Sequence, residues 1–181
     1  MRLEAQQSLV LVVDIQHKLA PAIVQSDQLQ QAALWVLQVA TQLKIPVLAT
    51  EQYPQGLGET VPELRALLPK QAIFSKIHFS ALREAPIQQA IAAQQRRQII
   101  LIGTESHVCV LQTALDLLSA GYQVFVVETA VGSRTLKDKR LALGRLQQAG
   151  VVIVSLEMLA FEWLDKAGTP EFNTLLKGWI R

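Results

Sequence analysis

The sequence contains only one cysteine, Cys109, among its 181 residues, so it cannot form an internal disulfide. A lone thiol favours a reducing compartment, and we expect a cytoplasmic protein. Residues 1–7 lack the apolar segment of a signal peptide, and no apolar run approaches membrane-spanning length. Aromatic residues are scarce, at 6% against 50% hydrophobic residues overall, which predicts an aliphatic core. We expect a soluble intracellular protein with no membrane partner.

The net charge is small, and the sequence lacks the histidine spacing of a metal site and the glycine motif of a dinucleotide site. The formal net charge is +2 and the basic residues are scattered, so we expect no nucleic-acid partner. His17, His78 and His107 lack partners at metal-ligand spacing. The turn at 14–17 reads Asp-Ile-Gln-His rather than G-x-G-x-x-G. A dinucleotide site is therefore excluded, because its backbone must approach a pyrophosphate through those glycines.

The chain does contain a regular alternation of short aliphatic runs with longer amphipathic stretches. The runs are nearly continuous in Val, Ile and Leu, as in strands covered on both faces. This alternation predicts one α/β domain over residues 1–181. We expect a three-layer α-β-α sandwich around a mainly parallel six-stranded sheet, with strand order 3-2-1-4-5-6. The predicted strands cover residues 9–13, 47–50, 72–75, 99–102, 124–127 and 151–154.

Amphipathic patterns and end signals predict three of the helices. Asp27, rather than Ser26, is the expected N-terminal cap of the first helix, because Gln30 three residues later can return the hydrogen bond. Gly121 and Gly150 stand where a C-terminal glycine ends the second and third helices. These helices are predicted to cover residues 27–43, from about 107 to before 121, and 136–149.

Two further segments carry expectations about surfaces. The loop at 51–62 contains two prolines and two glycines and is the predicted irregular wall of a site. The apolar tail after Pro170 is expected to dock on the domain or on a partner subunit. Apolar helix residues also suggest a homo-oligomer, a dimer or larger. These residues include Leu117, Leu118, Trp163 and Trp179.

Three reactive side chains follow strands whose carboxyl ends meet at one sheet edge, where ligands of open parallel sheets bind. Asp14 follows the first strand, Lys76 the third, and Cys109 lies in the turn after the fourth. An acid, an ammonium and a thiol within reach make an activated nucleophile. At the first turn of a helix, Cys109 also lies near unpaired N–H groups that favour a thiolate. Each residue also has an ordinary explanation: Asp14 as a helix or turn cap, Lys76 as a structural ion pair or a solvent-exposed side chain, and Cys109 as a core residue.

The residues around these positions resemble the signature segments of the isochorismatase-like cysteine hydrolases. The resemblance is closest to the isochorismatase-domain-containing branch and extends from about residue 8 to residue 160. The matching segments are 13–16 (Val-Asp-Ile-Gln), 74–76 (Phe-Ser-Lys), 103–110 (Gly-Thr-Glu-Ser-His-Val-Cys-Val) and, for the branch, 50–58 (Thr-Glu-Gln-Tyr-Pro-Gln-Gly-Leu-Gly).

The resemblance implies a catalytic triad of Asp14, Lys76 and Cys109, with Asp14 as general base toward the thiol and Lys76 supporting both. It also implies a cis peptide bond between Thr104 and Glu105, and an oxyanion hole formed by the backbone N–H groups of Glu105 and Cys109. The expected activity is metal-independent, amidase-like hydrolysis of a small molecule through a thioester intermediate. A non-catalytic binding or thiol redox-sensing protein on the same fold is the alternative.

The chain departs from two members of that superfamily. Nicotinamidases bind a divalent metal through histidines, but residues 50–58 contain none, so we expect no metal, no cofactor and no nicotinamide substrate. Isochorismate is doubtful because no arginine cluster lies near the predicted strand ends, although Arg134 could reach a carboxylate. Glu105 could bind a polar substrate group or hold its own turn. The candidate pocket-wall residues are Gln16, His17, Gln52 and Tyr53.

Overall fold

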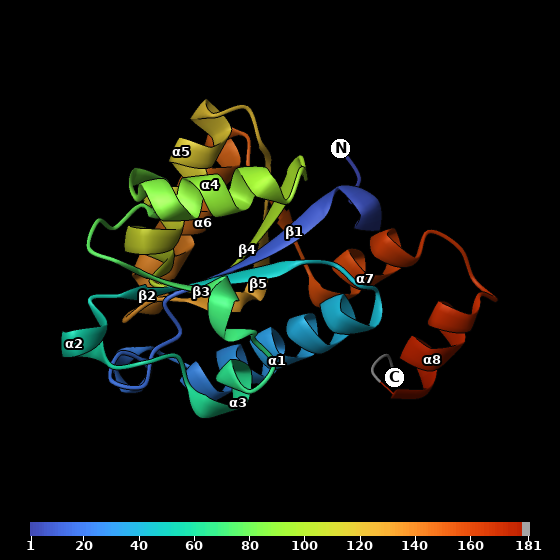
Figure 1. Cartoon of the computed structure of the whole chain (residues 1–181), viewed down its shortest axis with the longest axis horizontal. Coiled ribbons are helices and arrows are strands. Elements are labelled where there is room, and N and C mark those ends of the chain that lie inside the picture. The colour runs from blue at the N-terminus through green and yellow to red at the C-terminus, as the bar shows by residue number, and fades with distance from the viewer. Residues whose placement is uncertain (179–181) are drawn as a thin grey trace.

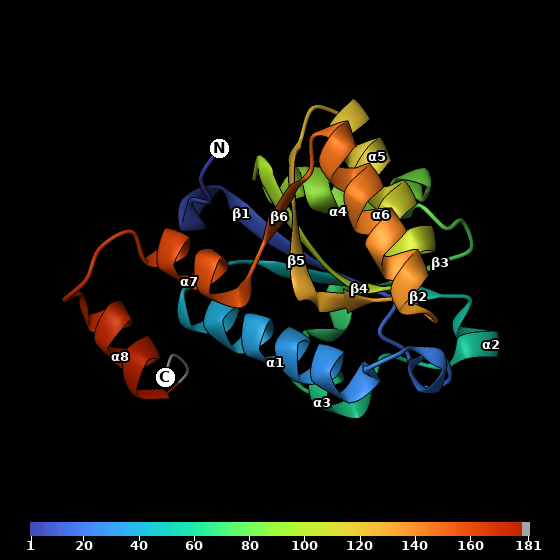
Figure 2. The ribbon, with the colours of Figure 1, turned by 180° about the vertical axis from the view of Figure 1, so that it is seen from behind.

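The computed structural model describes residues 1–178, which form a six-stranded sheet between two layers of helices (Figures 1 and 2). Every strand pairing is parallel and the order is β3-β2-β1-β4-β5-β6, which confirms the predicted fold. The strands are β1 Ser8–Val13, β2 Val47–Gln52, β3 Ile73–Lys76, β4 Gln98–Thr104, β5 Gln123–Gly132 and β6 Val152–Val154.

Helices cover both faces of the sheet. Figure 2 shows α4, α5 and α6 on one side, and α1, α3 and α7 on the other, with α8 beyond α7. The α-helices are α1 Ser26–Gln42, α2 Pro54–Leu57, α3 Pro62–Arg65, α4 Ala85–Ala93, α5 Leu111–Ser119, α6 Leu136–Ala149, α7 Leu156–Leu164 and α8 Pro170–Gly178. Shorter turns of 3₁₀ helix are η1 Ala5–Gln7, η2 Ala20–Ala22, η3 Lys70–Ala72 and η4 Ala81–Arg83.

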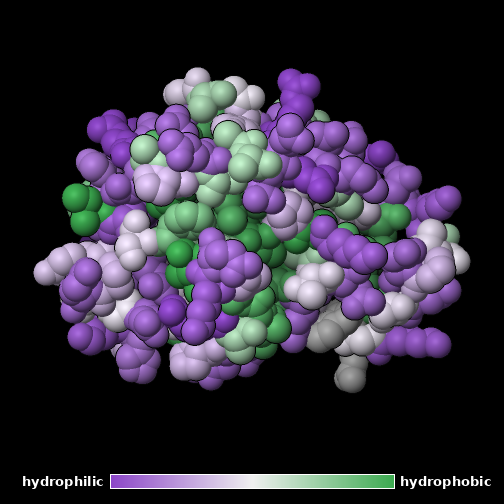
Figure 3. All heavy atoms as spheres, viewed as in Figure 1, coloured by the Kyte–Doolittle hydropathy of each residue, from purple (hydrophilic) through white to green (hydrophobic). Residues whose placement is uncertain are grey.

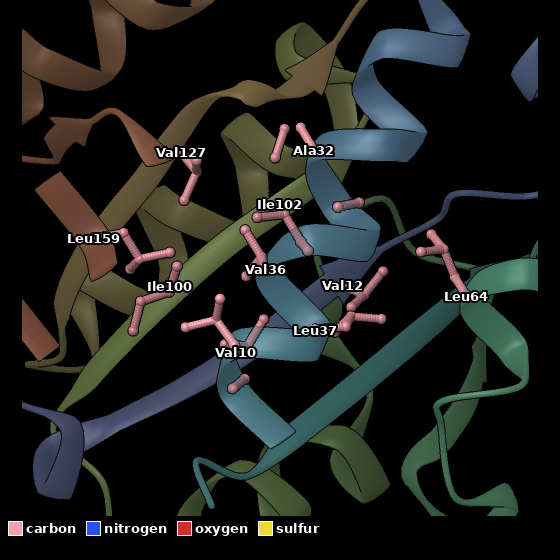
Figure 4. Packing of buried hydrophobic residues seen from close by; sticks show 14 of the residues in the cluster. Val10, Val12, Ala32, Val36, Leu37, Leu64, Ile100, Ile102, Val127 and Leu159 are labelled. Carbon is pink, nitrogen blue, oxygen red and sulfur yellow. The ribbon is translucent and has the colours of Figure 1, made fainter. Parts of the chain in front are cut away.

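The core is aliphatic and divided in two by the sheet, because successive side chains of a strand point to opposite faces. Val10 and Val12 of β1 pack beneath α1, where Figure 4 shows them near Val36 and Leu37. The alternate residues of β1 join the other cluster, under α4, α5 and α6. All six residues of β1 are buried, which explains why the first aliphatic run shows no alternation with polar residues.

Helix boundaries agree with the prediction at the ends of α5 and α6 and differ at the starts of α1 and α5. α5 ends before Gly121, which has φ 87°. α6 spans 136–149 as predicted, with Gly150 at φ 104° after it. α1 begins at Ser26, so the expected cap at Asp27 is wrong. Gln30 donates instead to the Ser26 hydroxyl, at 3.0 Å. The predicted helix from His107 is interrupted, because Ser106–Val110 forms a π turn before α5 begins.

Two residues expected at a subunit surface lie inside the domain instead. Leu117 is fully buried, and Trp163 is 5% exposed with its indole N–H donating to the Ser8 hydroxyl at 2.8 Å. The interpretation of these two as association surface is therefore wrong, while Leu118 is half-buried and Trp179 lies outside the described residues. The tail docks on the domain through Leu175, which is buried in the core.

Hydrophilic residues cover most of the face in Figure 3, and hydrophobic residues gather in its central part. No helix among residues 1–178 is long and apolar enough to cross a membrane.

Candidate catalytic site

The three predicted catalytic residues come from neighbouring strand ends. Asp14 follows β1 directly with φ 51°, and Lys76 is the last residue of β3. β2 lies between these strands, and the amide of Asp14 donates to the carbonyl oxygen of Thr50 at 3.1 Å. Cys109 lies in the π turn after β4, which pairs with β1 on its other side. The strand order thus brings the three residues to one edge of the sheet.

Asp14 and Lys76 form an ion pair that has no contact with solvent. Oδ2 of Asp14 lies 2.8 Å from Nζ of Lys76, and both side chains are 0% exposed. Oδ1 of Asp14 accepts a hydrogen bond from the Thr50 hydroxyl at 2.7 Å. Burial of either charge alone would cost several kcal/mol, so each ion requires the other. The carboxylate is held by a hydrogen bond at Oδ1 and faces the ammonium with Oδ2, which accepts no hydrogen bond.

Three uncharged acceptors surround the remaining part of the Lys76 ammonium. Nζ donates to Oε1 of Gln52 at 2.6 Å, to the carbonyl oxygen of Phe79 at 3.0 Å and to that of His78 at 3.2 Å. These three acceptors match the three protons of the ammonium, so Oδ2 of Asp14 faces it as an ion-pair partner that accepts no hydrogen bond. The Lys76 side chain is therefore held in place by contacts with four residues of the protein.

The Cys109 thiol lies close enough to both charged groups for its pKa to respond to them. Burial raises the pKa of the thiol to about 12, the negative charge of Asp14 acts in the same direction, and the positive charge of Lys76 lowers it. The expectation of a thiolate favoured by a helix start is thus wrong, because burial of a residue only 5% exposed outweighs the helix position. The thiol is protonated at neutral pH, and a carboxylate able to accept its proton lies nearby.

The turn that carries Cys109 has an unusual hydrogen-bond pattern. The carbonyl oxygen of Glu105 accepts from the amides of Val108 at 3.1 Å and Val110 at 3.2 Å. An α-helical turn would bond that oxygen to the amide of Cys109, four residues on. The π turn therefore leaves the Cys109 amide uncommitted to this carbonyl, and such turns are frequent at functional sites. The peptide bond between Thr104 and Glu105 is cis, at the position that the family resemblance implies.

Two contacts hold this turn against the end of β1. The Thr104 hydroxyl donates to the carbonyl oxygen of Asp14 at 2.6 Å. Gly103 has φ +129°, and a Cβ atom there would lie 1.9 Å from the carbonyl oxygen of Val13. Only glycine allows this close approach of the two backbones. Asp14 and the turn that carries Cys109 therefore keep a fixed separation.

Glu105 is occupied by an ion pair. Its Oε1 lies 2.6 Å from Nε of Arg134, and its side chain is 14% exposed. This contact is compatible with the structural role considered for Glu105, and the carboxylate that Arg134 reaches is that of Glu105. A second contact joins the same segments, since Nδ1 of His107 lies 2.9 Å from the Ser133 hydroxyl.

The four candidate wall residues divide into two buried and two exposed side chains. Gln16 is fully buried and Gln52 is 9% exposed, and both are engaged in hydrogen bonds. Tyr53 is 55% exposed and His17 is also exposed. Thr50 and Thr104 were not among the candidates, although both contact Asp14. Their place at the ends of aliphatic runs was the available signal.

Within residues 1–178, no group of three or more His, Cys, Asp or Glu side chains is arranged to hold a metal ion.

The model of the isochorismatase domain matches residues 8–158. Mouse isochorismatase domain-containing protein 2B is 39% identical over 177 residues, which cover 97% of this chain and 82% of that protein.

Two solved structures share the fold over nearly the whole chain. A structure described as MAR1 ribonuclease from Caenorhabditis elegans has a TM-score of 0.93 and 34% identity, covering 100% of this chain and 93% of the other. YcaC from Pseudomonas aeruginosa, solved with hexane-2,5-diol and covalent acrylamide, has a TM-score of 0.91 and 25% identity, covering 98% and 91%.

Proposed function

The chain belongs to the isochorismatase family, and on that premise we propose that it is a cysteine-dependent hydrolase of an amide-like C–N bond. The observation that carries the proposal is the fully buried Asp14–Lys76 ion pair beside the Cys109 thiol. A buried ion pair adds little net stability, and apolar residues of similar volume often serve as well. Its place beside a thiol, at the sheet edge where ligands bind, supports a chemical role.

The first step transfers the thiol proton to Asp14. Burial raises the pKa of the Cys109 thiol to about 12, so a nearby base is required at neutral pH. Asp14 accepts the proton from Sγ, and the Lys76 ammonium stabilises the thiolate as it forms. The ion pair supplies both groups within one rigid unit.

The thiolate then attacks the substrate carbonyl carbon. An S–C bond forms, and the oxygen of the tetrahedral intermediate accepts hydrogen bonds from the N–H groups of Glu105 and Cys109. The π turn supports this assignment, because it keeps the Cys109 amide away from the carbonyl of Glu105. One well-placed donor of this kind is worth about 3–4 kcal/mol of barrier.

Collapse of the intermediate breaks the C–N bond and leaves a thioester on Cys109. Asp14 gives its proton to the leaving nitrogen, and the amine departs. Water then attacks the thioester with Asp14 again as base, releasing a carboxylic acid and returning the proton to Sγ. We propose that this cycle needs no metal or cofactor, since Lys76 supplies the positive charge and residues 50–58 contain no histidine.

The cellular setting is also proposed. A single thiol that must stay reduced fits a reducing compartment such as the cytoplasm, with a small molecule as substrate.

The test measures release of ammonia or amine from a panel of small aliphatic amides, aromatic amides and cyclic imides. Wild-type protein is expected to turn over at least one of them, and Cys109→Ala, Asp14→Asn and Lys76→Met are each expected to lose at least about 10³-fold in kcat/KM. Hydroxylamine should capture the acyl group of the thioester in the wild type only. Full activity in Cys109→Ala would end the proposal.

The second part of the test offers the protein a single-stranded RNA, because the C. elegans neighbour is described as a ribonuclease. RNA cleavage that survives Cys109→Ala, with no amide turned over, would contradict the proposal. Reversible oxidation of Cys109 by peroxide with no turnover of any substrate would instead favour the redox-sensing alternative.

A further inference from the structure

We propose that Gln52 is a positioning residue for Lys76, held in place by Gln16, rather than part of a substrate-binding wall. This inference rests on the proposed hydrolytic function and assigns a role within it. The carboxamide oxygen of Gln52 makes the shortest contact of the Lys76 ammonium, at 2.6 Å. Gln52 and Lys76 are register partners on β2 and β3, so their side chains leave the sheet on the same face.

The orientation of the Gln52 carboxamide is determined by its other end. Nε2 of Gln52 donates to the carbonyl oxygen of Ile77 at 2.8 Å. Since that nitrogen must face a carbonyl, the oxygen must face the ammonium. Exchange of the two ends would place an N–H group against a cation and leave a buried carbonyl facing an oxygen. Gln52 therefore presents a fixed acceptor to Lys76.

Gln16 holds the Gln52 backbone in the manner of an additional strand. Oε1 of Gln16 accepts from the Gln52 amide at 2.7 Å, and Nε2 of Gln16 donates to the Gln52 carbonyl oxygen at 2.9 Å. The same nitrogen donates to the carbonyl oxygen of Gly58 at 2.7 Å. A side chain that is 0% exposed thus joins the ends of β1 and β2 to the loop at 51–62. In the Gln16 side chain, only one lone pair of Oε1 remains available to a substrate.

The lack of charge on Gln52 affects the charge balance around Lys76. A carboxamide accepts from the ammonium without adding negative charge, so Lys76 is balanced by Asp14 alone. The remaining field of the ammonium is available to the Cys109 thiolate, whose pKa it lowers. A glutamate at position 52 would share that field, raising the energy of the thiolate and slowing its formation. The position, the length and the neutrality of the Gln52 side chain therefore all affect how Lys76 acts on the thiol.

The experiment compares Gln52→Glu and Gln52→Met with Gln98→Met. Gln98 is a matched control, because it is 3% exposed and its carboxamide bonds the Arg2 and Glu4 backbone at the other end of β4. Alkylation of Cys109 by iodoacetamide at pH 8.5 reports the thiolate fraction and needs no substrate. Thermal unfolding of each variant reports whether it is folded.

Gln52→Glu is expected to slow alkylation about tenfold and Gln52→Met about fivefold, because Lys76 loses the contact that keeps it beside the thiol, while Gln98→Met stays within about twofold of the wild type. On the best amide of the panel, Gln52→Met is expected to lower kcat about 10–100-fold with KM unchanged, because Lys76 loses its shortest contact. A wall residue would instead raise KM and leave kcat intact.

Wild-type alkylation rates in folded Gln52→Glu, or a raised KM with normal kcat in Gln52→Met, would overturn the role of Gln52. If Gln52→Glu does not fold, the kinetic split in Gln52→Met decides. Should the wild type hydrolyse nothing, the alkylation arm still tests the positioning of Lys76, so failure of the hydrolase proposal and failure of this one are distinguishable.

Discussion

At the scale of single residues, the environment of Cys109 differs from what its place in the sequence indicates. A thiol at the start of a helix is expected to ionise easily, but burial raises its pKa to about 12. Asp14 and Lys76 shift that pKa in opposite directions, so removing one charge at a time should separate their effects. The same two charges are both required by the proposed hydrolysis.

Asp14→Asn should therefore speed iodoacetamide alkylation of Cys109 about tenfold at pH 8.5, and Lys76→Met should slow it by a similar factor. Both variants should lose hydrolysis, because one lacks the base and the other the stabilising cation. Rates are followed by intact mass over time. Parallel changes of alkylation and hydrolysis in Asp14→Asn would contradict the assignment of Asp14 as base.

Gly103 is the residue whose replacement should affect the fold most directly. Gly103→Ala should lower the free energy of unfolding by about 2–5 kcal/mol, since its Cβ would overlap the Val13 carbonyl at a φ of +129°. Gly144→Ala in α6 is the matched control, with no atom within 4 Å of the added methyl. It should stabilise by about 0.5–1 kcal/mol in urea unfolding. Equal effects of the two changes would show that the close approach is unimportant.

The convergence of Asp14, Lys76 and Cys109 could be predicted, because each follows a recognisable strand and strand order determines which ends meet. The sign of the thiol pKa shift could not, since it depends on how deeply the turn is packed. Gln16 and Gln52 show the same limit. Their polarity and place suggested contact with substrate, but only the structure reveals that their hydrogen bonds go to the backbone and to Lys76.

At the scale of elements, the segment after β3 is held from both sides. The Lys76 ammonium donates hydrogen bonds to the carbonyl oxygens of His78 and Phe79 in this segment, while the Glu84 carboxylate accepts hydrogen bonds from the amides of the segment. Oε1 of Glu84 lies 2.9 Å from the Ile77 amide, 3.1 Å from the His78 amide and 2.9 Å from Nδ1 of His78. This clamp connects an exposed loop to a residue of the candidate site.

The Glu84 clamp should give stability that depends on pH. Its hydrogen bond from the Ile77 amide, followed by that from the His78 side chain, lowers the pKa of Glu84 from 4.5 to about 2. A lowered folded-state pKa stabilises the fold above pH 4.5, and this contribution is lost as the pH falls toward 2. Because the carboxylate is partly exposed, Glu84→Gln should cost about 1 kcal/mol or less at pH 7.

Urea unfolding at pH 7, 4 and 3 measures this contribution. The difference between wild type and Glu84→Gln should shrink as the pH falls. Glu63→Gln is the control, at an exposed position in α3 that forms no ion pair with another residue of 1–178. A difference that stays constant from pH 7 to pH 3 would exclude the clamp.

Element boundaries illustrate why periodicity has limited resolution. The apolar stripe after His107 predicts a helix, and a helix is present, but the pattern does not distinguish an i+5 turn from an i+4 turn over its first residues. The start of α1 is another case. Asp27 and Gln30 fit a capping box, yet Gln25 takes a left-handed conformation and the helix begins one residue earlier.

At the scale of the whole molecule, the alternation of aliphatic and amphipathic segments was sufficient to predict a parallel sheet and both helix layers. It was not sufficient to predict the assembly. Leu117 and Trp163 fill the domain core, so neither is available to contact a partner subunit. Met158 and Phe161, three residues apart on α7, remain 55% and 44% exposed.

Two exposed apolar side chains do not by themselves indicate an interface, so self-association stays a prediction of the family resemblance. Light scattering during gel filtration should give a mass of about 40 kDa or more, against 20.0 kDa for one chain. A mass of one chain across a tenfold range of concentration would contradict self-association.

Because the Asp14–Lys76 pair is sealed from water, dissolved ions have no path between its partners. Sodium chloride at 1 M should therefore leave alkylation of Cys109 within about twofold of its rate at 0.05 M, whereas surface pairs such as Arg2–Asp165 weaken. The reactivity of a thiol beside such a buried pair should therefore be independent of the ionic strength of the medium.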